Sequence, residues 1–202
     1  MDFINILLAW HKKNKRDFPW RNTDNTFHVL LAELFLQQTS SVHVEKIYSK
    51  FINDFSTCED IISAEKKELM QYLSKLGLQN KRYKVLLNIC NNKGACEKDF
   101  YTKNNLEKIK GLGEYIINAT LCFGEGERLI IYDTNTSRVV GRYFGIDNKK
   151  EIKDKLETLL PVENYVDFNY ALLDFGALVC KAQNPMCGEC PMKEECKYNI
   201  DK

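Results

Sequence analysis

Four cysteines near the C-terminus constrain this chain more than any other feature of its sequence. They are Cys180, Cys187, Cys190 and Cys196, separated by six, two and five residues. Thiolates gathered in so short a segment can bind a tetrahedral zinc ion or an iron–sulfur cluster, because both need converging sulfur ligands. The spacing therefore predicts a metal centre and leaves the metal open.

A disulfide framework is the alternative for a chain with eight cysteines. The first twenty residues, however, lack the uninterrupted apolar core and the small-residue cleavage site of a signal peptide. We therefore expect a cytoplasmic protein, associated with the nucleoid if prokaryotic, with reduced thiols at the unpatterned cysteines Cys58, Cys90, Cys96 and Cys122. The histidines show no metal-binding spacing, and we interpret them as surface or packing residues: His11, His28 and His43.

The composition is that of a globular protein, with 202 residues and 44% hydrophobic content. No apolar run approaches the length that crosses a bilayer, so we expect no membrane partner. The formal net charge of +1 gives no argument for nucleic-acid binding, which would need basic residues gathered on one face. Two candidate clusters exist, within 12–21 and 81–84, although such runs are often solvated helix faces.

Apolar residues recur at helical spacing almost throughout the chain, for example Phe3, Ile6, Leu7 and Trp10. Breaks fall near Pro19, at 91–94, at 111–113, at 124–127 and at Pro161. The pattern predicts an all-α protein of roughly ten helices. We interpret the apolar run 129–132 as an extended connector that leads to Asp133, because a lone strand would have no partner.

Residues 106–119 have the pattern of a short helix, a turn with two glycines and a second helix. Glycine at positions 111 and 113 permits a tight turn whose amides, with the following helix N-terminus, can approach a phosphate. On this interpretation Gly111, Leu112 and Gly113 contact the DNA backbone as a helix-hairpin-helix. A Gly-x-Gly pair alone would equally fit an ordinary turn between helices.

The cysteine spacing, the glycine hairpin and the aspartate one helix later resemble the endonuclease III superfamily of helix-hairpin-helix DNA glycosylases, over essentially the whole chain. The resemblance implies a two-domain all-α fold: a central domain, 25–125, containing the hairpin at 106–119, and a second domain formed by 1–24 and 126–202. It favours a 4Fe-4S cluster in the loop 180–196 over zinc. It also implies double-stranded DNA with a mismatched or damaged base as partner, and we expect a monomer.

The resemblance assigns the chemistry to Asp133, together with Asn135. Breaking the bond between a base and deoxyribose builds positive charge on the sugar, which a nearby carboxylate stabilises. Many relatives carry an amine nucleophile at the position of Tyr115, and a phenol cannot form an imine. We therefore predict a monofunctional enzyme that leaves an abasic site, although Lys108 and Lys110 keep weak lyase activity open.

The segments Phe18–Arg21 and Ala32–Thr39 resemble the monofunctional mismatch branch of the superfamily. In that branch the position of Glu33 faces the flipped base, which a carboxylic acid can protonate as it leaves. The positions of Gln37 and Gln38 lie at the wedge that enters the DNA, to which we add Gln79. We also expect Arg82, in the second basic cluster, to contact DNA.

The released base is predicted to be thymine or uracil opposite guanine. The run 76–82 lacks the aromatic residues usual in adenine glycosylases, and the chain ends six residues after Cys196, where those enzymes continue. The segments 16–21 and 43–51 look like the thymine enzymes, whereas the pair Gln37-Gln38 looks like the adenine enzymes. An adenine glycosylase acting on A:G or A:8-oxoguanine, a non-catalytic iron–sulfur DNA-binding protein and a bifunctional endonuclease remain alternatives.

Overall fold

The computed structural model describes residues 3–92, 94 and 97–200, and within these ranges the chain is helical without a strand. Contacts divide it into two compact units. One comprises 17–127 and is called the hairpin unit here; the other comprises 1–16 with 128–202 and is called the terminal unit. The domain boundaries expected from the sequence, at 24–25 and 125–126, stay a prediction. Cys96 lies outside the described residues.

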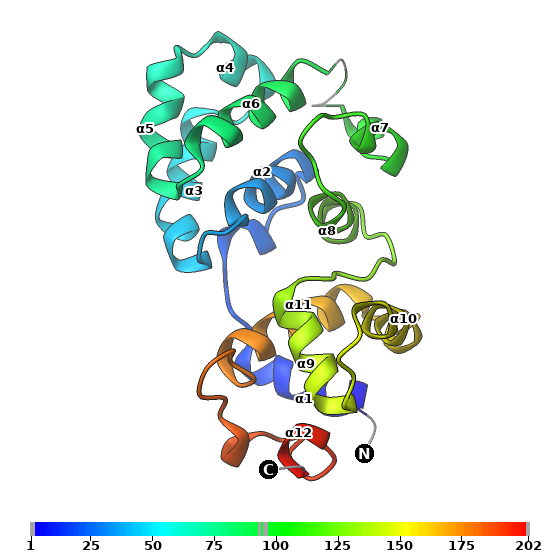
Figure 1. Ribbon diagram of the computed structural model, residues 1–202. Coiled ribbons are helices and arrows are strands. Elements are labelled where there is room, and N and C mark those ends of the chain that lie inside the picture. The colour runs from blue at the N-terminus through cyan, green and yellow to red at the C-terminus, as the bar shows by residue number, and fades with distance from the viewer. Residues whose placement is uncertain (1–2, 93, 95–96, 201–202) are drawn as a thin grey trace. The chain divides into compact units, whose positions relative to one another are not determined.

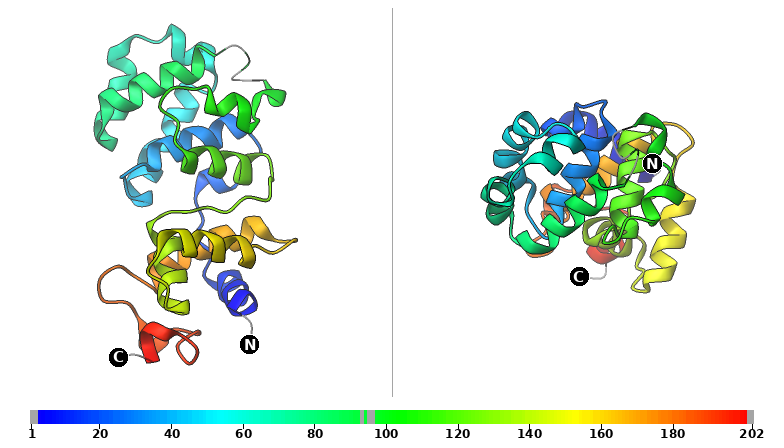
Figure 2. Two further views of the ribbon diagram at one scale, coloured as in Figure 1. Left: turned by 45° about the vertical axis from the view of Figure 1, so that its right-hand side comes forward. Right: turned by 90° about the horizontal axis from the view of Figure 1, so that it is seen from above.

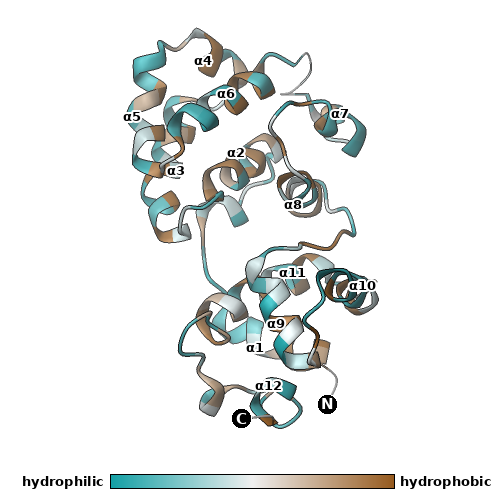
Figure 3. Cartoon of the chain, viewed as in Figure 1, coloured by the Kyte–Doolittle hydropathy of each residue, from teal (hydrophilic) through white to brown (hydrophobic). Residues whose placement is uncertain are grey.

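The hairpin unit is built around α2 (Thr26–Leu36), nine of whose eleven residues are buried. Figure 3 shows this helix as hydrophobic along most of its length. It packs against α8 (Glu114–Gly124) and α3 (Ser41–Asp54), and both neighbours are visible in Figure 1. The other elements are η1 (Pro19–Arg21), α4 (Cys58–Ser63), α5 (Lys66–Leu76), α6 (Gln79–Cys90), η2 (Lys98–Phe100) and α7 (Lys103–Glu107).

The close packing of α2 on α8 depends on a small residue. A Cβ atom on Gly124 would lie 2.5 Å from Cγ2 of Thr26, so any larger residue would push the two helices apart. At the same end, the side chain of Asn25 accepts hydrogen bonds from the backbone amides of Phe27 and His28 and caps α2. The sequence thus fixes both the start of α2 and its distance from α8.

The terminal unit contains α1 (Phe3–Asn14), α9 (Thr134–Phe144), α10 (Lys149–Leu159), α11 (Tyr165–Leu178), η3 (Cys187–Glu189) and α12 (Lys197–Ile200). Helix α11 packs against α1 and α9, and the left view of Figure 2 shows these helices from a second direction. The core of this unit includes Leu7, Val140, Phe168 and Met192, and the last of these comes from the cysteine loop. The loop is therefore part of the packing of its unit.

A buried ion cluster fastens the end of α1 to α11. Asp174 is fully buried and accepts hydrogen bonds from the backbone N (3.1 Å) and Nε (2.6 Å) of Arg16. Nε2 of His11 lies 3.3 Å from Oδ2 of the same carboxylate. His11 is thus a packing residue. Among the described residues, no helix is long and apolar enough to span a membrane.

Candidate active site

Asp133 occupies the N-cap position of α9, where the sequence placed a catalytic carboxylate. Its Oδ1 accepts hydrogen bonds from the backbone amides of Asn135 (2.8 Å) and Thr136 (2.7 Å). Its Oδ2 accepts one from the side-chain amide of Asn135 at 2.9 Å. The cap therefore holds the half-buried side chain of Asp133 in one orientation.

The segment leading to Asp133 is extended and forms no strand, as expected. It is held by Asn169, a buried residue of α11, whose side-chain amide donates to the carbonyl of Leu129 (2.9 Å). The Oδ1 atom of Asn169 accepts the backbone amide of Ile131 at 3.1 Å. One amide side chain thus pairs with the connector on both sides of residue 130.

Arg138, to which the sequence analysis gave no role, joins Asn135 to the cysteine loop. Its Nη2 donates to Oδ1 of Asn135 and to the carbonyl of Gly176, each at 2.8 Å, and its Nε donates to the carbonyl of Cys180 at 2.8 Å. Burial lowers the pKa of Arg138. The contact requires Gly176, since a Cβ there would lie 2.7 Å from Cβ of Asn135. A continuous set of hydrogen bonds therefore runs from Asp133 to the first cysteine of the loop.

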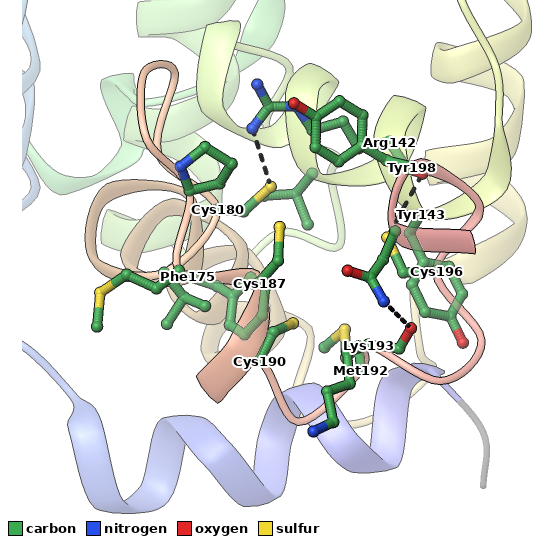
Figure 4. A pocket seen from close by; sticks show the side chains of 15 residues that line it. Arg142, Tyr143, Phe175, Cys180, Cys187, Cys190, Met192, Lys193, Cys196 and Tyr198 are labelled. Atoms are coloured by element: carbon green, nitrogen blue, oxygen red, sulfur yellow. Dashed lines mark hydrogen bonds between the residues drawn. The ribbon is translucent and has the colours of Figure 1, made fainter. Parts of the chain in front are cut away.

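The four patterned cysteines surround one cavity in the terminal unit (Figure 4). Phe175 and Met192 close its apolar side. Burial raises the pKa of the Cys190 and Cys196 thiols, and negative charge on neighbouring cysteines of the loop raises both further. In the part of the chain described, no group of three or more His, Cys, Asp or Glu side chains converges on a single metal ion.

The helix-hairpin-helix forms where the sequence predicted it, from α7, a turn and α8. Gly111 has φ of 104°, and a Cβ on it would lie 2.5 Å from Cγ2 of Val85. Gly113 is different: its φ is −96°, and no atom of the described chain lies within 4 Å of a Cβ placed there. Gly111 is therefore required by the protein's own packing, whereas Gly113 leaves exposed space beside the N-terminus of α8.

Glu33 and Tyr115 both lie in the hairpin unit, while Asp133 lies in the terminal unit. Glu33 is only 3% exposed, on a helix that is otherwise almost wholly apolar. Tyr115 is half-buried at the second residue of α8, directly after the glycine turn. The residues predicted to contact the base and to replace the amine nucleophile therefore belong to the two helices that pack together at the centre of this unit.

The predicted wedge residues lie on two loops of the hairpin unit, 37–40 and 76–79, which we call the wedge loops. Gln37 caps the end of α2, Gln38 is exposed with φ of 53°, and Gln79 is the first residue of α6. Leu78, which no pattern in the sequence marks as a site residue, has φ of 49° and is 41% exposed. An exposed leucine in a left-handed conformation is costly and points to a functional role.

The structure buries Arg82, and its predicted contact with DNA stays a prediction. Arg82 is only 1% exposed, and burial lowers its pKa. Its guanidinium donates to the carbonyls of Leu34, Leu76 and other residues at the ends of α2 and α5. These donors are directed inward, to carbonyl groups of the protein itself. The basic cluster that suggested the contact retains only its exposed lysines, Lys81 and Lys84.

The helical fold of this chain agrees with the folds of its relatives. Residues 31–162 match the HhH-GPD superfamily of base excision DNA repair proteins. The "Thymine/uracil-DNA glycosylase" of Methanothermobacter thermautotrophicus is 32% identical over 97% of this chain and 92% of its own length. The "Adenine DNA glycosylase" of Buchnera aphidicola subsp. Acyrthosiphon pisum is 30% identical over 99% of this chain and 60% of its own.

Solved structures of other proteins share the fold of this chain. A thermostable thymine-DNA glycosylase has a TM-score of 0.90 and 31% identity, covering 99% of this chain and 96% of that one. A non-covalent endonuclease III–DNA complex has a TM-score of 0.83 at 22% identity, covering 98% and 94%, and its likeness concerns the fold. The chain therefore belongs to the HhH-GPD superfamily of base excision DNA repair proteins, with the endonuclease III-like fold that the sequence predicted.

Proposed function

We propose that this protein is a monofunctional DNA glycosylase that releases thymine or uracil mispaired with guanine. The observation that carries the proposal is the match over nearly the full length of both chains to a thymine/uracil-DNA glycosylase. The capped Asp133 and the tyrosine at position 115 support the same activity.

The chemistry proposed for Asp133 follows from the fixed orientation of its carboxyl group. As the bond between base and deoxyribose breaks, positive charge develops on the sugar, and a carboxylate already oriented by the helix cap stabilises that charge without reorganising. The same carboxylate can orient the water that attacks the sugar. Glu33 would protonate or hydrogen-bond the departing base, a role that its burial among apolar residues favours.

Binding to DNA would use the hairpin turn and the wedge loops. The open space beside Gly113 and the following helix N-terminus allow a phosphate to approach the backbone amides. Leu78 and Gln38 are exposed on the wedge loops and can fill the space left by a flipped nucleotide. Flipping costs a few kcal/mol and costs less at a mismatch, so a weak pair favours capture of its base.

We further propose that the cysteine loop holds a 4Fe-4S cluster. A tetrahedral zinc ion and a 4Fe-4S cluster both take four thiolates. The four cysteines line one cavity, in the spacing that resembles the cluster loop of the superfamily, and this supports the cluster. When bound, the cluster would supply four strong cross-links to the loop. Iron and sulfide analysis of protein purified without air tests this, since equimolar zinc would contradict it.

The activity is tested with four matched duplexes that carry T:G, U:G, A:G and A:8-oxoguanine. Each is incubated with the protein and then analysed with and without alkali, which cleaves abasic sites. We expect alkali-dependent cleavage at T:G and U:G only. Cleavage at the adenine strand of the last two duplexes would support an adenine glycosylase, and inactivity on all four with retained DNA binding would support a binding protein.

The absence of lyase activity is tested by borohydride trapping on a substrate that the protein processes. A phenol cannot form the imine that borohydride reduces, so we expect no covalent adduct with the wild type. Tyr115→Lys places an amine at the start of α8, and this variant should give an adduct. Efficient trapping by the wild type would show that Lys108 or Lys110 acts as the amine.

A further inference from the structure

The buried guanidinium of Arg82 donates hydrogen bonds to both wedge loops. We propose that this buried guanidinium is a positioning residue that clamps the two wedge loops together and holds them in the conformation that extrudes a base. The inference deepens the proposed function and rests on it, because it concerns the same loops. It gives the residue a role in base flipping without any contact to substrate.

The clamp consists of hydrogen bonds from one guanidinium to the ends of two helices. At the end of α2, Nε donates to the carbonyl of Leu34 (3.2 Å) and Nη2 to those of Phe35 (3.1 Å) and Gln37. At the end of α5, Nη1 donates to the carbonyls of Leu76 (2.7 Å) and Gly77. These carbonyls are at helix ends, where they lack partners within the helix and carry partial negative charge. One cation thus satisfies the ends of two helices at once.

A second link joins the same loops. Nη2 of Arg82 also donates to Oγ1 of Thr39 (2.9 Å), and this hydroxyl donates to the carbonyl of Leu76 at 2.6 Å. The planar guanidinium has donors that point in several fixed directions, so it can serve both loops simultaneously. A lysine ammonium has three donors at one point and could not replace this set.

The clamp acts where each loop is strained. Its acceptors Gln37 and Gly77 directly precede Gln38 and Leu78, which have φ of 53° and 49°. Left-handed conformations of residues other than glycine persist only where the surrounding structure holds them. The carbonyl hydrogen bonds fix the peptide group that enters each strained residue. Loss of the clamp should therefore relax both loops together.

Helix α6 connects Arg82 to the hairpin turn at 111–113, which we propose binds a DNA phosphate. Val85 and Asn88 follow Arg82 at successive intervals of three residues, which places all three near one face of the helix. Val85 fills the space beside Gly111, and Nδ2 of Asn88 donates to the carbonyl of Lys110 at 2.8 Å. The helix thus joins the hairpin turn to the wedge loops, so that a bound phosphate and the wedge keep a fixed separation.

The first test is hydrogen exchange of the free protein, which needs no activity. Arg82→Met removes the donors, and amide exchange in both wedge loops should accelerate on the order of tenfold or more. Arg82→Lys should give an intermediate effect and also serves if the methionine variant does not fold. Lys81→Met removes an exposed charge from the same helix and should leave the loops unchanged. Unchanged exchange in both loops of the Arg82 variants would overturn the clamp.

The second test separates an effect on base flipping from a general loss of protein stability. Single-turnover base release is compared on a T:G duplex and on a duplex with the same thymine unpaired in a bulge, where extrusion costs less. Arg82→Met should lose on the order of tenfold more rate on T:G than on the bulge. Leu69→Ala, buried in α5 away from the loops, gives a destabilised control that should lose both rates alike.

Equal losses on both substrates for Arg82→Met would overturn the positioning role. For Arg82→Met, the slope of log affinity against log salt concentration should stay that of the wild type, because a buried cation releases no counterions from DNA. A decrease of about one in the magnitude of this slope would indicate a phosphate contact and contradict the proposal. If the wild type releases neither base, the proposed function fails while hydrogen exchange still decides on the clamp.

Discussion

At the scale of single residues, the two oxygens of Asp133 have different tasks. Oδ1 is held by two backbone amides, whereas Oδ2 pairs with the side chain of Asn135. A side chain can adjust to a substrate more easily than a helix backbone can. Oδ2 is therefore the oxygen that we expect to face the sugar, and Asn135 the residue that orients it.

Replacing Asp133 by Asn removes the charge and keeps the cap, because asparagine is as good an N-cap residue as aspartate. The melting temperature should change little. Single-turnover base release should fall about a hundredfold or more, because an electrostatic stabiliser of the transition state is lost. Retained activity in a folded variant would move the catalytic role to another residue.

Replacing Arg138 by Met breaks the link between Asn135 and the cysteine loop. The carbonyls of Gly176 and Cys180 would lose a buried donor, so the free energy of unfolding should fall by about 2 kcal/mol. Because Asn135 is then free to turn, kcat should fall about tenfold with little change in the affinity for DNA. Asn135→Ala should reproduce the kcat effect with a smaller loss of stability, and a change confined to KM would contradict this role.

The helical periodicity of the sequence indicates that Arg82 is buried. Within the predicted helix, Arg82 stands four and seven residues before Leu86 and Ile89, which are both buried, so it shares their face. Its neighbours Lys81 and Lys84 are basic, which favours an exposed charged cluster, whereas the helical periodicity predicts that Arg82 is buried. The pairing of Asp174 with Arg16, 158 residues apart, could not be predicted, because nothing local marks a partner so distant.

At the scale of elements, the two hairpin glycines predict opposite phenotypes. Gly111→Ala combines a left-handed φ with a clash against Val85, so it should cost about 2 kcal/mol of stability or more. Gly113→Ala meets open space and should leave the melting temperature within a degree or two. It should instead weaken DNA binding, since the methyl group would occupy the path of the phosphate.

Melting curves and DNA titrations of the two alanine variants check this contrast directly. Val85→Ala in the Gly111→Ala background should recover part of the lost stability by removing the steric clash. Unchanged DNA affinity in Gly113→Ala would show that the exposed turn does not bind a DNA phosphate. Equal destabilisation by both substitutions would contradict the difference that the structure draws between the glycines.

Most helices could be predicted because local rules agree along them. The breaks at 111–113 and 124–127 fall where glycines stand, and the connector before Asp133 forms no strand. The wedge loops could be placed by resemblance, but not Leu78 as their exposed residue, since an isolated leucine ordinarily predicts burial. The preceding residue, Gly77, accepts a tertiary hydrogen bond from Arg82, and local sequence patterns do not predict such a bond.

At the scale of the whole molecule, the chain builds two cores and passes between them twice, at 16–17 and at 127–128. The cysteine loop contributes Met192 to the core of the terminal unit, with Cys180, Cys190 and Cys196 packed against it. The expected cluster would therefore stabilise one unit directly. Its removal should affect the two units unequally.

Calorimetry of Cys187→Ala tests this expectation. The substitution removes one ligand from a half-exposed position with little loss of packing, so bound iron should fall sharply. If about 3 kcal/mol is lost from the terminal unit, its transition should move down by roughly 12–24 °C. Cys58→Ala changes the same atoms in the buried core of the hairpin unit and should lower only the other transition. A single transition that moves equally in both variants would mean that the units unfold as one, and that the cluster supports the hairpin and wedge loops as well as the helix that bears Asp133.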